Sequence, residues 1–438
     1  MKEFIDNCYE KCISGYALDR EEIKKLLDIE IGSSIDLYMQ KKSRDVATYI
    51  TNNQARLWCA IGMDFDLCPM NCKFCSMGEK WHLVNKKNHI STENLLSDVT
   101  RYVNLGAGYI VLRTTEFYSV DMLINFTHEI REKIPGNYEI VFNTGELDLF
   151  TAKMISENGI YGCYHALRLG EGIDTPFDKK TRIDTMKAIS SSGLNLMTLI
   201  EPLSYDHTND EITDIIINAI ECEAFLFGVM ALNPVKGTPF EDKKIVDNKK
   251  MAHVVSVARL SCGTKVKEIC AYPSSIECMN AGANVTVIET GAIPRSDAYC
   301  YTDWMCENID NKKKLLKEAG YTISMPPAKA VGLVKCPCAG TTDEDFLKPM
   351  LLILISKEDI SVLALCKKYL SIMNYDENNL DVMAEIGDVL KDMNNLKYID
   401  INNNICSITR YGIKYLTYWK NKIEDYKKSI DKIYRYIK

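Results

Sequence analysis

Three cysteines, Cys68, Cys72 and Cys75, lie within eight residues of one another at spacings of four and three. The arrangement C-x3-C-x2-C places three thiols on one short loop, and Phe74 directly precedes the last of them. A structural zinc site takes four ligands, and His82 is the nearby candidate for a fourth. Electron-transfer iron–sulfur clusters also take four cysteines, so three cysteines leave one iron of a 4Fe–4S cluster open. A catalytic cluster therefore fits the spacing better than zinc or three buried structural cysteines.

The cysteine spacing, with an aromatic residue before the third thiol, resembles the signature of the radical S-adenosylmethionine (SAM) superfamily. The resemblance implies that the three cysteines hold a 4Fe–4S cluster whose open iron binds the amino and carboxylate groups of SAM. It also implies that one-electron reduction cleaves SAM to a 5′-deoxyadenosyl radical, which abstracts hydrogen from a substrate. A one-electron donor such as flavodoxin or ferredoxin would then be a partner.

Short apolar runs alternate with amphipathic helical stretches from about residue 55 to residue 335. This alternation predicts an α/β fold with a parallel TIM-type (βα) barrel. Barrel enzymes place their chemistry on the loops after the strands, and the cysteine loop follows the first run. The runs that we expect to form the strands are Leu57–Gly62, Tyr109–Arg113, Tyr138–Thr144, Gly162–Leu167, Leu194–Glu201, Phe225–Leu232, Lys265–Ile269 and Asn284–Ile288.

Shifts in pattern divide the chain into four predicted segments. They are an N-terminal helical cap, the barrel, a proline-containing linker and a small winged-helix-like α+β domain, at residues 1–50, 51–320, 321–345 and 346–438. The last segment shows three helical stretches, two alternating runs around Asn402-Asn403-Asn404, and a final helix from Tyr411. A β-hairpin after three helices predicts the winged-helix-like arrangement.

Charge and composition limit the partners and the compartment. The stretch 378–394 carries four acidic residues and one lysine, and the net charge of the chain is −7. Nucleic-acid binding is therefore not expected, and a lid, a dimer contact or a docking surface for a partner protein fits the C-terminal domain better. The chain shows neither a signal-peptide pattern nor an apolar run that could span a membrane. We expect a cytoplasmic protein whose thiols are reduced or metal-bound.

Polar residues follow the second and third predicted strands. Glu116 ends the segment Thr-Thr-Glu, where the radical SAM resemblance implies a short motif, often Gly-Gly-Glu, that binds the SAM amino group. Asn143 and Gly145 form a polar turn after the third strand, and a glycine lets backbone amides approach a ligand closely. The alternative for each is an exposed residue at the end of a strand.

The fourth predicted strand leads into His165, Arg168 and Glu171, and Arg182 begins the next helix. An arginine and a glutamate three residues apart suit a zwitterionic ligand that carries a ribose. The arginine can hold a carboxylate through two hydrogen bonds, and the glutamate can accept from the ribose hydroxyls. Surface ion pairs are the alternative.

Three further stretches resemble the biotin-synthase-like group of radical SAM enzymes. They are His-x-Leu-Arg-x-x-Glu from His165, Pro234–Pro239 and Met279–Asn284. The group includes biotin synthase, a maturase of iron–iron hydrogenase and the methylornithine synthase of pyrrolysine biosynthesis. The resemblance implies that Arg182 contacts the SAM carboxylate and that the residues after the fourth strand lie around SAM or substrate.

The chain departs from biotin synthase in its barrel interior. Biotin synthase holds a second, sulfur-donating cluster with cysteines on inner strands, whereas Phe142 and Met197 occupy the matching positions here. Biotin formation is therefore not expected. Four late cysteines form two pairs that could hold an auxiliary cluster or a structural zinc, or could be buried apolar residues: Cys300, Cys306, Cys336 and Cys338.

Together these features predict a radical SAM enzyme that abstracts hydrogen from a small-molecule substrate. A rearrangement or fragmentation in cofactor or metabolite biosynthesis is the expected reaction. Two alternatives stay open. One is a sulfur-inserting enzyme with an auxiliary cluster at the late cysteines, and the other is a SAM- or redox-responsive regulator that uses the winged-helix-like domain.

Overall fold

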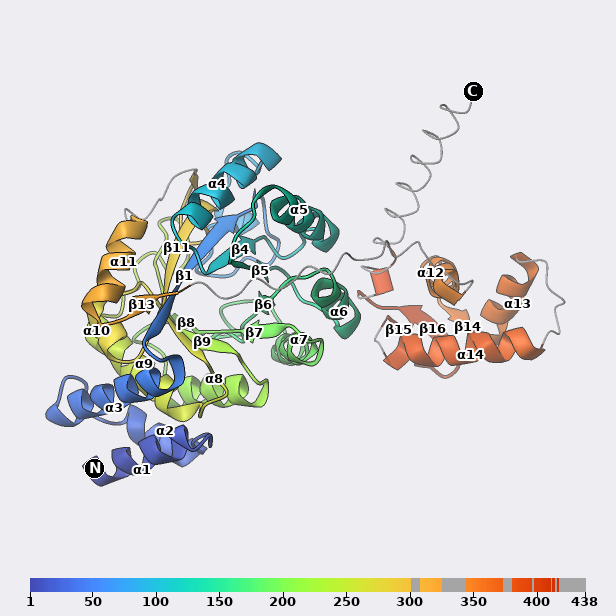
Figure 1. The fold of residues 1–438 in the computed structure, drawn as a ribbon. Helices are drawn as coiled ribbons and strands as arrows, with labels where there is room; N and C mark the ends of the chain where they lie inside the picture. The colour runs from blue at the N-terminus through green and yellow to red at the C-terminus, as the bar shows by residue number, and fades with distance from the viewer. Residues whose placement is uncertain are drawn as a thin grey trace. The chain divides into compact units, whose positions relative to one another are not determined.

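The computed structural model describes residues 1–300, 308–324, 344–372, 380–395, 398–410, 412–413 and 416. The chain forms two compact units, Met1–Gly332 and Leu333–Lys438, and each is described by itself (Figure 1). Within the described ranges, no helix has both the length and the apolar character that a membrane span requires.

Among the described residues of the first unit, eight parallel strands close into a barrel (Figure 1). In ring order they are β1 (Gln54–Gly62), β4 (Tyr109–Arg113), β5 (Glu139–Asn143), β6 (Gly162–Tyr164), β7 (Asn195–Met197), β9 (Leu226–Ala231), β10 (Glu268–Tyr272) and β11 (Val285–Ala292). β1 pairs with both β4 and β11, which closes the ring, and a further parallel strand, β8 (Ile200–Leu203), pairs with β9. The predicted α/β barrel is confirmed.

Side chains along the strands alternate between two buried layers. Val111 and Val141 belong to an interior cluster made only of strand residues and their close neighbours, and Met197 lies there as expected. Phe142 belongs instead to the outer cluster, in which strand residues pack against helices. The alignment that placed Phe142 inside the barrel was therefore wrong by one residue, because the side-chain period of a strand is two.

Helices surround the barrel, and polar side chains cap their first turns. At α7, for example, the Asp178 carboxylate accepts from the backbone N–H of Thr181, which fixes the turn that carries Arg182. The surrounding helices are α4 (Thr92–Asn104), α5 (Val120–Lys133), α6 (Leu149–Glu157), α7 (Lys179–Ser191), α8 (Asn209–Glu221), α9 (Asn248–Ser261), α10 (Ile276–Asn280) and α11 (Ile309–Glu318).

Three N-terminal helices pack on α8 and α9 (Figure 1). They are α1 (Lys2–Ile13), α2 (Arg20–Leu27) and α3 (Ser34–Thr51). The ring of His253 on α9 lies 2.9 Å from the Asp36 carboxylate on α3, and both side chains are buried. The Ser43 hydroxyl of α3 donates to the backbone oxygen of Ala281 at 2.7 Å. These buried polar contacts hold the N-terminal helices against the second half of the barrel.

The amino ends of the strands enclose a lower charged group, formed by Arg56, Tyr109 and Glu268. The Tyr109 hydroxyl donates to the Glu268 carboxylate at 2.7 Å, and Arg56 Nε lies 3.4 Å from that carboxylate. Burial raises the pKa of Glu268, although the nearby Arg56 charge acts in the opposite direction. β10 begins at Glu268, three residues after the start of the predicted run Lys265–Ile269.

The second unit contains three helices and a three-stranded antiparallel sheet with the order β14-β16-β15 in its described residues. Asn403 and Asn404 have positive φ angles of 50° and 62° in the turn between β15 and β16, as the asparagine triplet predicted. The predicted final helix from Tyr411 falls almost entirely outside the described residues. The elements are α12 (Glu344–Ile355), β14 (Ile360–Ser361), α13 (Val362–Ile372), α14 (Leu380–Asn395), β15 (Ile399–Asn402) and β16 (Ile405–Ile408).

Candidate active site

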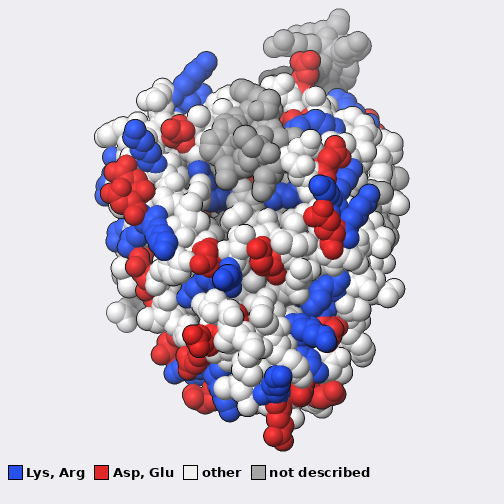
Figure 2. Space-filling model, turned by 90° about the vertical axis from the view of Figure 1, so that its left-hand side faces the viewer, with Lys and Arg blue, Asp and Glu red and all other residues white. Residues whose placement is uncertain are grey.

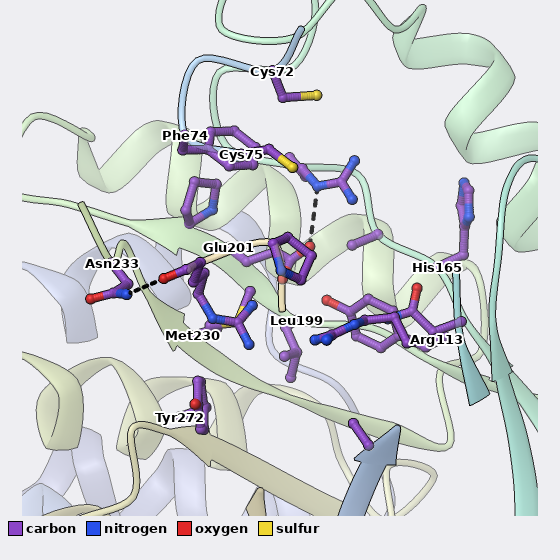
Figure 3. A pocket seen from close by; sticks show the side chains of 18 of the residues that line it. Cys72, Phe74, Cys75, Arg113, His165, Leu199, Glu201, Met230, Asn233 and Tyr272 are labelled. Carbon is purple, nitrogen blue, oxygen red and sulfur yellow. Dashed lines mark hydrogen bonds and ion pairs between the residues drawn. The ribbon is translucent and has the colours of Figure 1, made fainter. Parts of the chain in front are cut away.

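A cavity of about 190 Å³ lies at the carboxyl ends of the barrel strands (Figure 3). Arg113, Asn143 and Tyr164 line it, and each is the last residue of its strand. Figure 3 shows Cys72 at one end of the cavity and Tyr272 at the opposite end. Of the face that Figure 2 shows, the described part carries Lys and Arg interspersed with Asp and Glu. The cavity therefore occupies the end of the barrel where parallel-barrel enzymes place their chemistry.

The cysteine loop, residues 66–78, is folded by its own backbone hydrogen bonds. The N–H of Cys68 donates to the oxygen of Met77 at 2.8 Å, and that of Cys75 donates to the oxygen of Cys72 at 3.0 Å. Asn71 occupies the left-handed region with a φ of 49°, which asparagine tolerates better than most residues. The loop thus turns back on itself, and all three cysteines line the cavity.

The three thiols supply the kind of donor that an iron–sulfur cluster takes. Burial raises the pKa of Cys68 to about 11, that of Cys72 to about 12, and also that of Cys75. Across the described ranges, no three His, Cys, Asp or Glu side chains converge as ligands of one ion would. Cysteines of a 4Fe–4S cluster bind different irons, so their sulfur atoms lie farther apart than the ligands of a single metal ion. His82, the candidate fourth zinc ligand, is exposed and outside the cavity lining.

Arg182 contacts residues that the sequence predicted on separate strands. Its guanidinium lies 3.7 Å from a carboxylate oxygen of Glu116 and 3.8 Å from one of Glu171. Its Nη1 lies 3.1 Å from Nε2 of His165. The ring of Phe177 packs beneath the guanidinium, with its centroid 3.5 Å from Cζ. The first turn of α7 and the ends of β4 and β6 therefore meet at one buried cation.

Eight of the ten predicted site residues line the cavity, and Glu171 and Gly145 lie behind its wall. Arg168 lines it, with Nε 3.3 Å from a carboxylate oxygen of Glu201. The Glu171 carboxylate accepts from the backbone N–H of Arg168 at 3.0 Å and so holds that turn. At Gly145 an added Cβ would come within 2.0 Å of the backbone oxygen of Glu116, so only glycine fits. Glu171 and Gly145 therefore support the cavity wall without lining the cavity.

The sequence analysis missed an upper charged group, formed by Arg113, Glu289 and Arg295. Both arginines form ion pairs with the single Glu289 carboxylate, and Arg295 Cζ lies 4.9 Å from the ring centroid of Tyr272. The sequence did carry a signal, because Arg113 ends the run Tyr-Ile-Val-Leu-Arg and Glu289 interrupts the apolar run of β11. A charge inside a buried strand needs a partner or a ligand.

Apolar side chains form the rest of the cavity wall, among them Trp58, Leu226 and Val287 from the strands and Leu199 between β7 and β8. Cys270 lies with them, and it is the only thiol outside the cysteine loop among the cavity residues described. The cavity thus combines a few charged groups with an apolar surface, as small-molecule sites do.

Most of the late cysteines cannot be placed at a site. Cys306, Cys336 and Cys338 lie outside the described residues. The backbone of Cys300 belongs to β12 (Tyr299–Cys300), but its side chain lies outside the described part. The second metal site stays a prediction.

The chain is similar in sequence to biotin synthases. No protein-family model matches the chain. A biotin synthase of Sulfurihydrogenibium sp. (strain YO3AOP1) is 23% identical over 267 residues, which cover 59% of this chain and 79% of that protein. A biotin synthase of Clostridioides difficile (strain 630) is 19% identical over 341 residues, which cover 74% of this chain and 100% of that protein.

Two solved structures share the fold at low identity. Methylornithine synthase (PylB) has a TM-score of 0.59 and 18% identity, with 74% of this chain and 98% of that chain covered. HydG, a maturase of the FeFe-hydrogenase, has a TM-score of 0.62 and 15% identity, with 97% of this chain and 94% of that chain covered. With the closed barrel and the cysteine loop, these similarities support the resemblance to the biotin-synthase-like group of the radical SAM superfamily.

Proposed function

We propose that Cys68, Cys72 and Cys75 hold a 4Fe–4S cluster and that the enzyme uses it to abstract hydrogen from a small organic substrate. The observation that carries this proposal is that three thiols of one loop share a cavity with Glu116 and Arg182. When bound, the reduced cluster supplies the electron that cleaves SAM to a 5′-deoxyadenosyl radical. A flavodoxin- or ferredoxin-type protein would deliver that electron.

The charged residues beside the cysteine loop suit SAM. Arg182 would bind the SAM carboxylate, and Glu116 would accept from the SAM ammonium group. Arg168 and His165 would complete the pocket, with Asn143 at the end of β5. Glu171 and Gly145 would hold this wall in place without forming it. Because Arg182 is 2% exposed, its interaction with a bound carboxylate would be little screened by water.

The apolar part of the cavity would hold the substrate and exclude water from a reactive radical. The interior positions of β5 and β7 are Val141 and Met197, and Cys270 is the one further thiol on the described wall. A sulfur-donating cluster would need a set of ligands there. These observations favour a rearrangement or fragmentation in cofactor or metabolite biosynthesis over sulfur insertion.

Anaerobic iron and sulfide analysis of the reconstituted protein tests the cluster, and deoxyadenosine formation from SAM and dithionite tests the reaction. We expect about four irons per chain and formation of deoxyadenosine. Cys72→Ala should lose both. Cys222→Ala, at the buried end of α8 and outside the cavity, should keep both.

Two outcomes would contradict this proposal. Iron content that Cys72→Ala leaves unchanged would remove the cysteine loop as the cluster site. About eight irons, falling to about four in the Cys300→Ala/Cys338→Ala variant, would establish an auxiliary cluster and favour sulfur insertion.

A further inference from the structure

Cys270 is the one thiol on the described cavity wall that does not belong to the cysteine loop. It is the middle residue of β10, it is 2% exposed, and it belongs to the interior cluster of the barrel. Because side chains alternate along a strand, Cys270 and Tyr272 point to the same side of β10, and both line the cavity. Two residues of a strand span roughly 6–7 Å, so Cys270 lies about that much deeper in the barrel than Tyr272, the last residue of β10.

The neighbouring strand places no side chain beside the Cys270 thiol. Gly228 of β9 pairs with Cys270, and an added Cβ there would come within 2.0 Å of the backbone oxygen of Cys270. Only glycine fits such a close approach. The residues two positions away, Leu226 and Met230, line the cavity instead. On the side of β9, the thiol therefore has no neighbouring side chain at its own level in the barrel.

The Cys270 thiol can give up its hydrogen as an atom. Burial raises the pKa of Cys270, and the nearby Glu268 carboxylate raises it further, so the sulfur keeps its proton. An S–H bond is weaker than the C–H bond of an alkyl group, so a carbon radical takes hydrogen from a thiol in a downhill step. Cys68, Cys72 and Cys75 could not supply this hydrogen, because cysteines bind a cluster as thiolates.

Tyr164 gives an independent sign that this part of the cavity takes a polar ligand. Tyr164 is 8% exposed, and its hydroxyl is buried and makes no hydrogen bond of normal geometry within the described structure. Burial raises the pKa of Tyr164, and the nearby Glu201 carboxylate raises it further. The ring lies edge-on to Trp58 in the interior cluster, with the centroids 6.3 Å apart. A buried hydroxyl without an acceptor costs free energy, which a polar group of a bound substrate can recover.

We propose that Cys270 is a catalytic residue that donates a hydrogen atom to the carbon radical of the substrate. Hydrogen abstraction starts beside the cysteine loop, whereas the Cys270 thiol lies deeper in the barrel, and a substrate held against Trp58 and Leu226 would lie between the two. The hydrogen removed and the hydrogen returned are then different atoms, so SAM is consumed in each turnover and not regenerated. This inference rests on the proposed function, because it adds the step that ends the radical reaction in the same cavity.

The atoms and electrons of this step balance with one further electron. The S–H bond of Cys270 breaks, a C–H bond forms on the substrate, and an unpaired electron stays on the sulfur as a thiyl radical. The flavodoxin- or ferredoxin-type donor then supplies an electron, and water supplies a proton, which restores the thiol. Each turnover therefore takes one electron for SAM cleavage and a second for the sulfur.

The test follows the hydrogen of the thiol with deuterium. The reconstituted holoprotein is exchanged into D2O, and SAM and dithionite are added without substrate, so that nothing shields the thiol from the deoxyadenosyl radical. Mass spectrometry then measures the deuterium in the deoxyadenosine that forms. We expect most of the wild-type product to carry a single deuterium, because the thiol exchanges with water and holds its hydrogen weakly. Cys270→Ala should lose this deuterium.

Two further variants separate hydrogen donation from packing. Cys270→Ser is close to the wild type in volume, but its O–H bond is too strong to give up hydrogen, so the deuterium should be lost here too. Cys163→Ala is the matched control, because Cys163 is a buried strand thiol that packs in the outer cluster and does not line the cavity. It should keep the deuterium. Unchanged iron content and melting temperature establish that each variant folds and holds its cluster.

The other outcomes overturn the inference. Deoxyadenosine without deuterium from the wild type would do so and would leave the proposed function standing. Deuterium that survives Cys270→Ala would also do so, and its loss in Tyr164→Phe would then make the tyrosine the donor. Loss of deuterium in Cys163→Ala would show that the loss does not depend on the cavity. Absence of deoxyadenosine from every protein would contradict the proposed function itself, and this inference would fall with it.

Discussion

The barrel contains two buried charged groups made of the same residue types, and they differ in charge balance. The lower charged group matches one arginine, Arg56, with one glutamate, Glu268. The upper charged group sets two arginines against Glu289 alone. None of the lower group lines the cavity, whereas all three residues of the upper group do. The comparison teaches that the same residue types are packed away from the cavity at one end of the strands and line it at the other.

The pKa shifts of Glu268 and Glu289 show whether burial or the neighbouring positive charges prevail in each group. Burial opposes ionisation in both, because it removes a carboxylate from water. At Glu268 burial prevails, and the pKa is raised although Arg56, the Tyr109 hydroxyl and Arg259 act in the opposite direction. At Glu289 two close arginines prevail, and the pKa falls to about 2. Two close ion pairs therefore outweigh burial at Glu289, whereas one longer ion pair with Arg56 does not outweigh it at Glu268.

The largest expected effect is on the folding of the upper charged group. Glu289→Ala leaves two buried guanidinium groups without a counter-charge and should lower the free energy of unfolding by about 3–5 kcal/mol. Urea unfolding of the barrel, followed by circular dichroism, measures this loss. The two groups would be energetically alike if Glu268→Ala cost as much as Glu289→Ala, and that result would break the comparison.

The next effect is a difference in pH dependence. The folded chain holds the ionised form of Glu289, so its stabilisation is present above about pH 4.5 and is lost as the pH falls toward 2. Between pH 6 and pH 3 the wild type should lose about 2 kcal/mol more unfolding free energy than Glu289→Gln. The pH dependence that Glu268 gives to stability has the opposite sign. Its raised pKa favours the protonated carboxyl group, so its contribution to stability is lost as the pH rises through that pKa. Parallel pH profiles for wild type and Glu289→Gln would show that Glu289 is not held ionised.

A matched pair of tyrosine substitutions separates packing from binding. Tyr109→Phe removes the hydroxyl that donates to Glu268 and should cost about 1–2 kcal/mol of unfolding free energy, with deoxyadenosine formation unchanged. Tyr272→Ala removes the ring that lies against the Arg295 guanidinium and should weaken ligand binding in the cavity, whereas Tyr272→Phe keeps that ring and should not. Calorimetry with SAM and urea unfolding on these variants measure the two effects. Loss of deoxyadenosine formation in Tyr109→Phe would contradict the division.

An exposed ion pair gives the smallest expected effect and sets the scale for the others. Arg20 of α2 pairs with Asp214 of α8, and their side chains are 46% and 57% exposed. Water screens such a pair, so Arg20→Ala should change the free energy of unfolding by less than about 1 kcal/mol. A loss as large as that of Glu289→Ala would mean that burial does not govern these energies.

The parts of the fold that depend on local pattern could be predicted from the sequence. The strand Tyr109–Arg113 was placed at its observed bounds, because a run of apolar residues between a glycine break and a polar turn marks a buried strand. The run Lys265–Ile269 was placed too early, because the strand admits Glu268 at its start. Tyr109 and Arg56, which are distant in the sequence, contact that glutamate and permit its burial in the strand. The local pattern of one sequence does not show which distant residues will contact each other.

The same limit applies to the site. The three cysteines carry their chemistry in their spacing, and Glu116, His165 and Arg182 could be found as polar residues at strand or helix ends. The upper charged group could not, because Arg113 and Glu289 are 176 residues apart and meet only when the barrel closes. Recognition of such a group requires the register of the closed sheet.

The closure of the ring also bears on how the chain folds as it is synthesised. β1 pairs with β11, and α3 packs on α9, so residues near position 50 find their partners only near positions 250 to 290. At about 5–20 residues per second, translation delays this meeting by roughly 10 to 50 seconds. During that interval the apolar faces of the N-terminal helices, with Ile5, Ile23 and Met39, have no barrel to cover them. These faces therefore stay exposed to water until the last strand completes the ring.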